Sequence, residues 1–130
     1  MPTPEQCRFA KSHEWAWPDG ALVRVGLSDH AQREITDVVF VELPKPGRRV
    51  GAGEACAVVE SVKAAFDIYA PVSGEIVGIN AELINDPALV NRSPHDQGWF
   101  FSIRPSDPQQ SGALMDHQQY QDFLKANAHP

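Results

Sequence analysis

The feature that most constrains the fold of this chain is an internal repeat with a period of 27 residues, the interval from Pro44 to Pro71. At this displacement further residues coincide in one register: Gly47 with Gly74, Val50 with Val77, and Gly51 with Gly78. Each copy has a strand-like stretch followed by Pro-x-x-Gly and x-x-Val-Gly. Repeats of about 20–50 residues are typical of stacked units. Unless the coincidence of common turn residues is due to chance, two copies predict two β-units that face each other about a pseudo-two-fold axis.

Short stretches rich in β-branched and aromatic residues fill the middle of the chain, and prolines and glycines separate them. In one of them Val23 and Val25 share a face that Arg24 does not, as the period of two in a strand requires. The predicted strands are 21–27, 38–43, 55–62, 66–70, 75–79 and 99–103. Many short strands with this punctuation predict a mainly β fold of the barrel or sandwich type.

Helical signals occur mainly near the margins of the predicted β region. Ser28 is a suitable N-cap for a short helix at 29–35, because its side chain can accept a hydrogen bond from the first turn. A single turn is expected at 87–90. Asp116 is a suitable N-cap for the last helix, within a C-terminal helical segment of about 107–128. We expect these helices to pack against the sheets.

Length and composition narrow the class of protein. The 130 residues predict a single domain spanning 1–130, with 42% hydrophobic and 22% charged residues as in typical globular proteins. The net charge of -6 makes nucleic acid and anionic membranes unlikely partners, since both require a basic face. No apolar run approaches the ~20 residues of a membrane span, and the first residues lack signal-peptide features. We therefore expect a cytoplasmic protein in which Cys7 and Cys56 are free thiols.

Common catalytic and metal-binding motifs are incomplete in this chain. Residues 13–17 begin like the zinc motif His-Glu-x-x-His, but Trp17 stands in place of the second histidine. Residues 26–30 lack the final glycine of Gly-x-Ser-x-Gly. The glycine-rich stretch 47–53 lacks the Gly-Lys-Ser/Thr ending of a phosphate-binding loop. The five histidines show no metal-ligand spacing. We therefore expect neither catalytic residues of its own nor a metal site.

Lys63 lies between two β-forming stretches, 55–62 and 66–70, where a hairpin turn is expected. A lysine at such a tip is usually only a solvated charge. Ala64 and Ala65 beside it, however, have little bulk with which to cover the amine. An enzyme that reads the surrounding fold could acylate this amine, and the acylated side chain would then project as a long tether. The residues therefore allow a carrier function.

Six ordered blocks of the sequence resemble one known family. Residues 60–65 (ESVKAA) and 67–75 (DIYAPVSGE) are similar to the lipoyl-lysine segment of the glycine cleavage system H protein family. The other matching blocks are 9–15, 25–32, 38–44, 89–94 and 98–99. The related biotin-carrier family brackets its lysine with methionines, whereas Val62 and Ala64 stand here. The resemblance therefore extends over nearly the whole chain.

This resemblance implies a fold and a modification. The fold is a barrel-sandwich hybrid of two facing sheets with a pseudo-two-fold axis, short peripheral helices and a C-terminal helix. Lipoate would be attached to Lys63 by a lipoate ligase or lipoyl transferase that recognises Glu60 and Gly74. Gly74 is also expected to be a turn residue with positive φ. The alternatives are that Gly74 is only a turn glycine and Glu60 only a solvated strand residue.

The resemblance also implies a function as a non-catalytic carrier. The lipoyl group on Lys63 would be a swinging arm that takes an aminomethyl group from glycine decarboxylase and presents it to an aminomethyltransferase. Dihydrolipoyl dehydrogenase would then remove the reducing equivalents. A cationic cargo requires an anion nearby, and Glu14 and Asp67 are the candidates, with Ser12 as a hydrogen-bond partner. Each of these acids could alternatively be an ordinary surface residue.

Three departures from the family pattern leave a second interpretation open. Phe66 stands where a small polar residue is common, 34–37 replaces a stretch that usually ends Leu-Gly-Asp or Leu-Gly-Glu, and Cys7 precedes the first block. An aromatic ring beside the arm favours an apolar or sulfur cargo. H-like lipoate-binding proteins of bacterial sulfur oxidation would carry sulfur intermediates for a heterodisulfide-reductase-like complex. Neutral drift, an enzyme with its own active site and an unmodified relative are the remaining alternatives.

Overall fold

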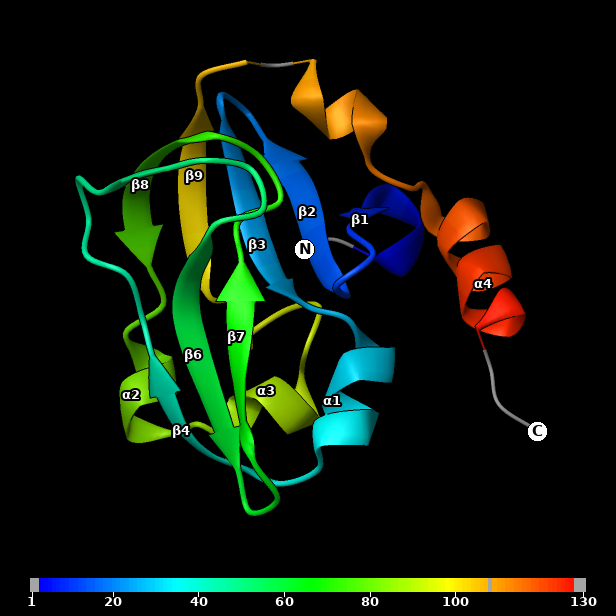
Figure 1. Ribbon diagram of the computed structural model, residues 1–130. Coiled ribbons are helices and arrows are strands. Elements are labelled where there is room, and N and C mark those ends of the chain that lie inside the picture. The colour runs from blue at the N-terminus through cyan, green and yellow to red at the C-terminus, as the bar shows by residue number, and fades with distance from the viewer. Residues whose placement is uncertain (1–2, 108, 128–130) are drawn as a thin grey trace.

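Two antiparallel sheets face each other in the computed structural model, which describes residues 3–107 and 109–127 (Figure 1). The six-stranded sheet has the spatial order β1 (Arg8–Phe9), β2 (Glu14–Asp19), β3 (Leu22–Leu27), β9 (Phe101–Pro105), β8 (Gly74–Ile79) and β5 (Arg49–Val50). The three-stranded sheet has the order β4 (Val38–Glu42), β6 (Ala55–Ser61) and β7 (Ala65–Tyr69). The mainly β fold with two facing sheets is therefore confirmed.

All six predicted strands are present, with ends shifted by no more than a few residues. The described residues contain three further strands, β1, β2 and β5, that the sequence pattern did not predict. β1 and β5 have two residues each, too few for a period of two to show. β2 contains two tryptophans and a proline, and its burial pattern runs buried-buried-buried before it becomes exposed, so it does not alternate.

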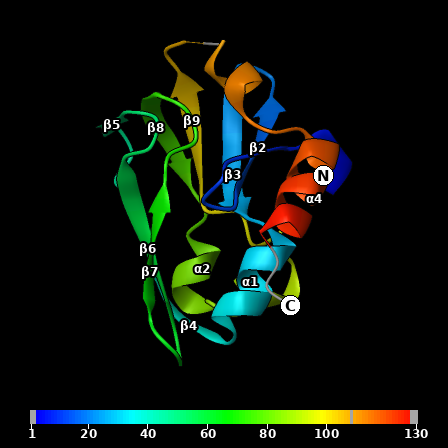
Figure 2. The ribbon, with the colours of Figure 1, turned by 45° about the vertical axis from the view of Figure 1, so that its right-hand side comes forward.

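The helical elements of the described residues are η1 (Pro4–Gln6), α1 (Asp29–Ile35), α2 (Glu82–Asn85), α3 (Leu89–Arg92), η2 (Gln110–Ala113) and α4 (His117–Ala126). The short helices α1, α2 and α3 close one end of the two sheets, and the longer helix α4 covers one side; the single turns η1 and η2 lie elsewhere (Figures 1 and 2). The Ala31 amide donates a hydrogen bond to Ser28 Oγ, and the Gln119 amide donates to Asp116 Oδ1, so both predicted N-caps are confirmed. α4 packs against β1 and η1. Residues 108 and 128 of the predicted C-terminal helical segment lie outside the described residues.

The internal repeat corresponds to two passages of the chain from the small sheet to the large one. β4 and β7 are the two edges of the small sheet, on either side of β6, while β5 and β8 are neighbours in the large sheet. The chain turns from one sheet to the other at Pro44 in the first copy and at Pro71 in the second, and both prolines are buried. The two copies therefore begin at opposite edges of the small sheet and end side by side in the large one.

The repeated glycines of the two copies have different structural roles. Gly47 has a φ of 94°, and a Cβ atom there would meet nothing within 4 Å. Gly74 does not have a positive φ, so the expectation of a left-handed turn residue is wrong. A Cβ atom at Gly74 would lie 2.1 Å from the carbonyl oxygen of Arg104 and 2.7 Å from Ile103 Cγ2. Gly74 is therefore required by the close approach of β9.

Two apolar clusters stabilise the fold. The larger lies between the sheets and includes Val25, Val59 and Ile76, all fully buried. The smaller joins β1 and β2 to α4, and consists of Cys7, Phe9, Trp15 and Tyr120. This second cluster removes apolar side chains of α4 and of the large sheet from water together, and each Å² of apolar area buried in this way contributes about 25 cal/mol. The cluster therefore anchors the C-terminal helix to the large sheet. Among the described residues no helix has both the length and the apolar composition needed to cross a bilayer.

Candidate functional site

Lys63 lies at the tip of the β6–β7 hairpin, which projects beyond the sheets at the bottom of Figure 1. Ser61 organises this turn: its hydroxyl oxygen accepts hydrogen bonds from the amides of Lys63 (3.1 Å) and Ala64 (3.2 Å). The Val62 amide donates to the Asp37 carbonyl at 3.0 Å, which ties the tip to the chain before β4. The tip is thus held by its backbone, and the Lys63 side chain is exposed.

Within the described part of the chain, the ammonium group of Lys63 makes one hydrogen bond. Its Nζ donates a hydrogen bond to the Glu34 carbonyl oxygen at 3.1 Å, at the end of α1. A single hydrogen bond of an exposed lysine to a backbone carbonyl contributes little, because water competes for both groups. The amine is therefore accessible to an acylating enzyme.

Glu60 belongs to the outward face of the small sheet. Its neighbour Val59 is fully buried, and successive strand residues point to opposite faces. On this outward face Glu60 pairs with Phe40 of β4 on one side and with Ala65 of β7 on the other. Phe40 is 49% exposed, and Val62 at the tip is 70% exposed. Glu60 therefore lies in an accessible row of side chains next to the lysine turn.

A cleft of about 440 Å³ opens on the other side of the hairpin, toward α1. Four of the predicted site residues line it: Lys63, Ser12, Phe66 and Asp67. The other lining residues are His13, Leu27, Ala31, Glu34, Ile35, Val59, Ala64 and Ile68. Phe66 is half-buried and packs against the central core, whereas Asp67 is exposed at the rim. The cleft therefore combines an apolar wall with polar groups at its mouth.

Glu14 lies behind this cleft and does not line it. The Glu14 residue is 1% exposed. Its carboxyl group accepts one hydrogen bond from the Ser12 hydroxyl and another from the Tyr69 amide at 3.0 Å. Burial raises the pKa of Glu14, and the two hydrogen bonds oppose that rise. The predicted pair of Ser12 and Glu14 is thus brought together, with Ser12 between the carboxyl group and the cleft.

Two cleft residues, His13 and Glu34, were not predicted from the sequence. Glu34 contacts His30 one helical turn away, with 2.9 Å between His30 Nε2 and Glu34 Oε1. Their spacing of four on a predicted helix was a usable signal. His13 has a φ of 78°, and its Nδ1 lies 2.8 Å from the Tyr120 hydroxyl. A contact between residues so distant in the chain leaves no local sequence signal.

Both cysteines are poor candidates for thiol chemistry. Cys7 is 2% exposed, and its Sγ donates to the Thr3 carbonyl at 3.5 Å. Burial raises the pKa of Cys7 to about 12, and that of Cys56 to about 12 as well. The thiolate is the reactive form of cysteine. These environments therefore disfavour the thiol role considered for Cys7.

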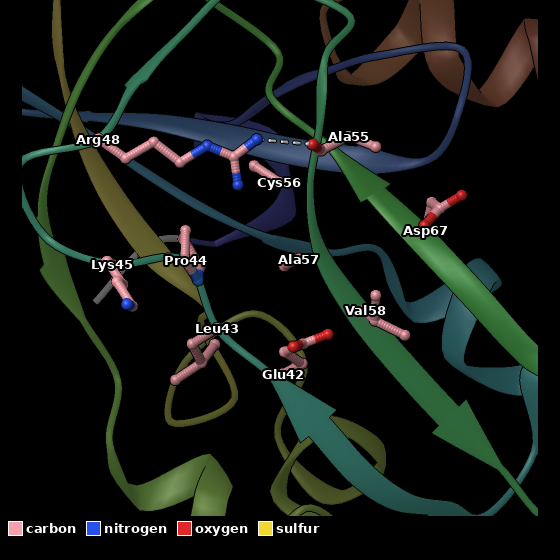
Figure 3. A pocket seen from close by; sticks show the side chains of 10 residues that line it. All are labelled: Glu42, Leu43, Pro44, Lys45, Arg48, Ala55, Cys56, Ala57, Val58 and Asp67. Carbon is pink, nitrogen blue, oxygen red and sulfur yellow. Dashed lines mark hydrogen bonds between the residues drawn. The ribbon is translucent and has the colours of Figure 1, made fainter.

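A second hollow, of about 510 Å³, lies near the start of β6, where the chain leaves β4 (Figure 3). It shares Asp67 with the cleft and is otherwise lined by different residues, with Cys56 and Ala57 at β6. Arg48 crosses it and donates to the Ala55 carbonyl at 3.2 Å, besides pairing with Glu54 at 2.9 Å. The hollow does not contain Lys63, so it belongs to a different part of the surface.

Comparison with known proteins places this geometry in a family. Residues 7–127 match the model of the glycine cleavage H-protein family. The glycine cleavage system H protein of Thermus thermophilus is 50% identical over 128 residues, which cover 98% of this chain and 100% of that protein. The one from Shewanella denitrificans is 51% identical over 122 residues, covering 93% and 95%.

A solved structure agrees with these matches. The crystal structure of a glycine cleavage system H protein from Mycobacterium marinum superposes with a TM-score of 0.82 and 35% identity, covering 96% of this chain and 98% of that one. The resemblance seen in the sequence is confirmed, and the sulfur-oxidation alternative receives no support from these matches. The chain therefore belongs to the glycine cleavage H-protein family, whose members are non-catalytic lipoyl carriers.

Proposed function

We propose that lipoate is joined to Lys63 by an amide and serves as a swinging arm within the glycine cleavage system. When bound, the lipoyl disulfide accepts an aminomethyl group together with reducing equivalents and later releases both. The observation that carries this proposal is that an exposed lysine stands on a rigid hairpin tip at the mouth of a cleft. Ala64 and Ala65 leave room beside the amine, so the residues present fit this group.

The outward face of the hairpin is suited to the enzyme that attaches lipoate. Glu60 lies three residues before Lys63 and pairs with Phe40, so an acid and an exposed ring stand beside the amine. We propose that a lipoate ligase or lipoyl transferase recognises Glu60 directly. Gly74 would contribute indirectly, because its missing side chain lets β8 and β9 approach and so fixes the shape that the enzyme meets.

The cleft side of the hairpin is suited to a cationic cargo. A protonated amine that enters beside Ser12 would meet the carboxyl group of Glu14 directly behind it, and Asp67 at the rim. At 4 Å such a pair of charges gains about 4 kcal/mol at an effective dielectric constant of 20, before desolvation is subtracted. Phe66 and Leu27 exclude water on the apolar wall. The protein would thereby protect its cargo from hydrolysis.

The arm must also leave this cleft to reach its partners. Once the cationic cargo is gone, the acids no longer attract the arm, and the exposed tip allows it to move out. The partners we propose are glycine decarboxylase, the aminomethyltransferase and dihydrolipoyl dehydrogenase. Acylation of Lys63 removes a positive charge, which makes the net charge of -6 about one unit more negative. Transient docking on several enzymes suits such an acidic surface, because long-range attraction speeds encounter.

The modification itself can be tested by intact mass spectrometry of the protein expressed in a host competent for lipoylation. We expect one lipoyl addition on the wild type and none on Lys63→Arg. Lys125→Arg is the matched control, because Lys125 is an exposed lysine on α4, remote in the chain from the hairpin, and this variant should carry the full addition. An unmodified wild type, or a lipoyl group retained by Lys63→Arg, would contradict the proposal.

A further inference from the structure

Tyr120 connects the C-terminal helix to both walls of the cleft without lining the cleft itself. It lies on α4 and is 2% exposed. Its hydroxyl is 2.8 Å from His13 Nδ1 and 2.7 Å from Ser28 Oγ. His13 precedes β2, and Ser28 caps α1, so this hydroxyl links the side chains of two segments whose adjoining strands, β2 and β3, are paired.

Each end of this hydrogen-bond chain leads to a residue of the cleft wall. His13 lines the cleft directly. In the sequence it stands between Ser12 and Glu14, which are joined by a hydrogen bond. At the other end the Ala31 amide donates to Ser28 Oγ at 3.1 Å, and Ala31 lines the facing wall. The Tyr120 hydroxyl therefore adds a side-chain brace between the 12–14 turn and α1, beside the backbone hydrogen bond from the Ser28 amide to the His13 carbonyl oxygen.

The proton positions along this chain of contacts are assigned from the hydrogen bonds that each group can make, starting from the Ala31 amide, which can only donate. The Ala31 amide donates to Ser28 Oγ, the Ser28 hydroxyl donates to Tyr120, and the Tyr120 hydroxyl donates to His13 Nδ1. Burial raises the pKa of Tyr120 to about 12, so its hydroxyl keeps the proton that it donates. The imidazole is then neutral, and burial with the nearby His30 lowers the pKa of His13 in the same direction.

His13 needs such support, because its backbone is strained. A φ of 78° is uncommon for a residue other than glycine and costs free energy that the surroundings must offset. The backbone is held by the His13 amide, which donates to the Ala10 carbonyl at 2.9 Å, and by the Ser28 amide, which donates to the His13 carbonyl at 2.9 Å. The side chain is held by Tyr120. The turn that carries Ser12 is therefore fixed from both sides.

We propose that Tyr120 is a positioning residue, whose hydroxyl holds the His13 turn against α1 so that Ser12 and Glu14 stay aligned on the cargo. The inference deepens the proposed carrier function and rests on it. The ring of Tyr120 contributes separately, by stacking on Phe9 with 4.3 Å between centroids and 2° between planes. Because phenylalanine preserves that stacking, Tyr120→Phe removes the hydroxyl and leaves the packing.

The direct test measures the lifetime of the cargo. Lipoylated protein is loaded with glycine and glycine decarboxylase, then separated from the enzyme. Hydrolysis breaks the bond between sulfur and the aminomethyl carbon: water supplies the oxygen of formaldehyde, the amine leaves as ammonium, and the thiol regains a proton. We expect Tyr120→Phe to release formaldehyde about fivefold faster than the wild type, as expected for one lost hydrogen bond. Its extent of lipoylation should be unchanged.

A control variant separates this role from simple stability. Phe123→Leu trims another ring of α4 that contacts His13, at 6.2 Å between centroids, and leaves the Tyr120 hydroxyl in place. It should lower the melting temperature without shortening the cargo lifetime. An equal shortening in Phe123→Leu, or an unchanged lifetime in Tyr120→Phe, would overturn the proposal. Failure of the wild type itself to load would instead overturn the carrier function.

Rescue at the other end of the hydrogen bond gives an independent measurement. Asparagine and glycine both tolerate the positive φ of His13, but only asparagine offers an acceptor near the position of Nδ1. We expect His13→Asn to retain most of the cargo lifetime and His13→Gly to lose about fivefold, as Tyr120→Phe does. The nitrogen chemical shift of the His13 imidazole should also change in Tyr120→Phe. Equal lifetimes for His13→Asn and His13→Gly would contradict the role of the hydroxyl.

Discussion

The outward and cleft faces of the β6–β7 hairpin share one backbone and differ in almost every physical property. On the outward face Glu60 pairs with Phe40 and is accessible to solvent and to other proteins. On the cleft face the adjacent Val59 is fully buried, and Phe66 forms part of the wall of the cleft. The period of two in a strand thus lets neighbouring residues serve an attaching enzyme and a bound cargo separately.

The difference also predicts the size of substitution effects. Charges on the outward face interact through water and are screened by salt, so a single residue there contributes modestly. The carboxyl group of Glu14, behind the cleft, is buried and hydrogen-bonded, so its interactions with a charge are stronger. Substitutions on the two faces should therefore affect different steps, and those on the cleft side should have the larger consequences.

The largest expected effect is at Gly74, which belongs to neither face. Gly74→Ala would place a Cβ atom 2.1 Å from the Arg104 carbonyl oxygen, and backbone cannot easily yield, so we expect the free energy of unfolding to fall by about 3 kcal/mol. Gly47→Ala is the control: it has open space but a positive φ, and should cost about 1 kcal/mol. Urea denaturation measures both. Equal losses would show that the approach of β9 is not what requires Gly74.

The next largest effect is expected on the cleft side of the hairpin, at Glu14. Glu14→Gln removes the negative charge but keeps hydrogen-bonding capacity toward Ser12 and Tyr69. We expect the loaded arm to hydrolyse about tenfold faster, because a charge-assisted hydrogen bond between the carboxylate and the cationic cargo becomes a weaker neutral one. The rate of lipoylation should not change. A cargo lifetime equal to that of the wild type would remove Glu14 from the cargo site.

A smaller effect is expected on the outward face. Glu60→Gln should reduce kcat/KM for lipoylation by about fivefold, because a half-buried charge at the protein surface, screened by water, contributes roughly 1 kcal/mol to recognition. Glu42→Gln, on the same strand as Phe40 but further from the tip, is the matched control and should be lipoylated normally. Neither variant should alter the lifetime of the loaded arm. A change in that lifetime would break the separation between the two faces.

The smallest expected effect is in the dependence of stability on pH. Burial raises the pKa of Glu14 above its ordinary value of 4.5, so the folded state of the empty protein binds this proton more tightly than the unfolded state. Stability from this group is therefore present below pH 4.5 and is lost as the pH rises through the raised pKa. Glu14→Gln should gain stability relative to the wild type over that range. A difference that stays constant with pH in urea titrations would contradict a raised pKa.

The sequence predicted the fold where its local pattern agreed with the tertiary structure. The caps at Ser28 and Asp116 and the alternation around Val25 are local signals, and each was confirmed. β5 has two residues and exists because Arg49 and Val50 pair with Glu75 and Gly74 of β8, which no local pattern encodes. Tertiary pairing explains the strands that were missed.

The site shows the same division. Lys63, Ser12 and Asp67 were predicted from a resemblance in sequence, Phe66 was predicted from a departure from the family pattern, and all four line one cleft. The role of Tyr120 could not be predicted, because its partners are 107 and 92 positions away in the chain. The prediction of a positive φ at Gly74 was wrong, because this position requires glycine for the close approach of β9 and not for its backbone conformation. Its repeat partner Gly47 does lie in the left-handed region. Equivalent positions in a repeat can therefore require the same residue type for different structural reasons.

The central claim is that Lys63 carries a glycine-derived carbon on its lipoyl group. The most direct measurement incubates the lipoylated protein with glycine decarboxylase and glycine labelled at its methylene carbon, and then determines the mass of the peptide that contains Lys63. We predict a labelled aminomethyl addition on that peptide, absent without glycine and absent from Lys63→Arg. A lipoylated Lys63 peptide that acquires no labelled carbon under these conditions would contradict the account.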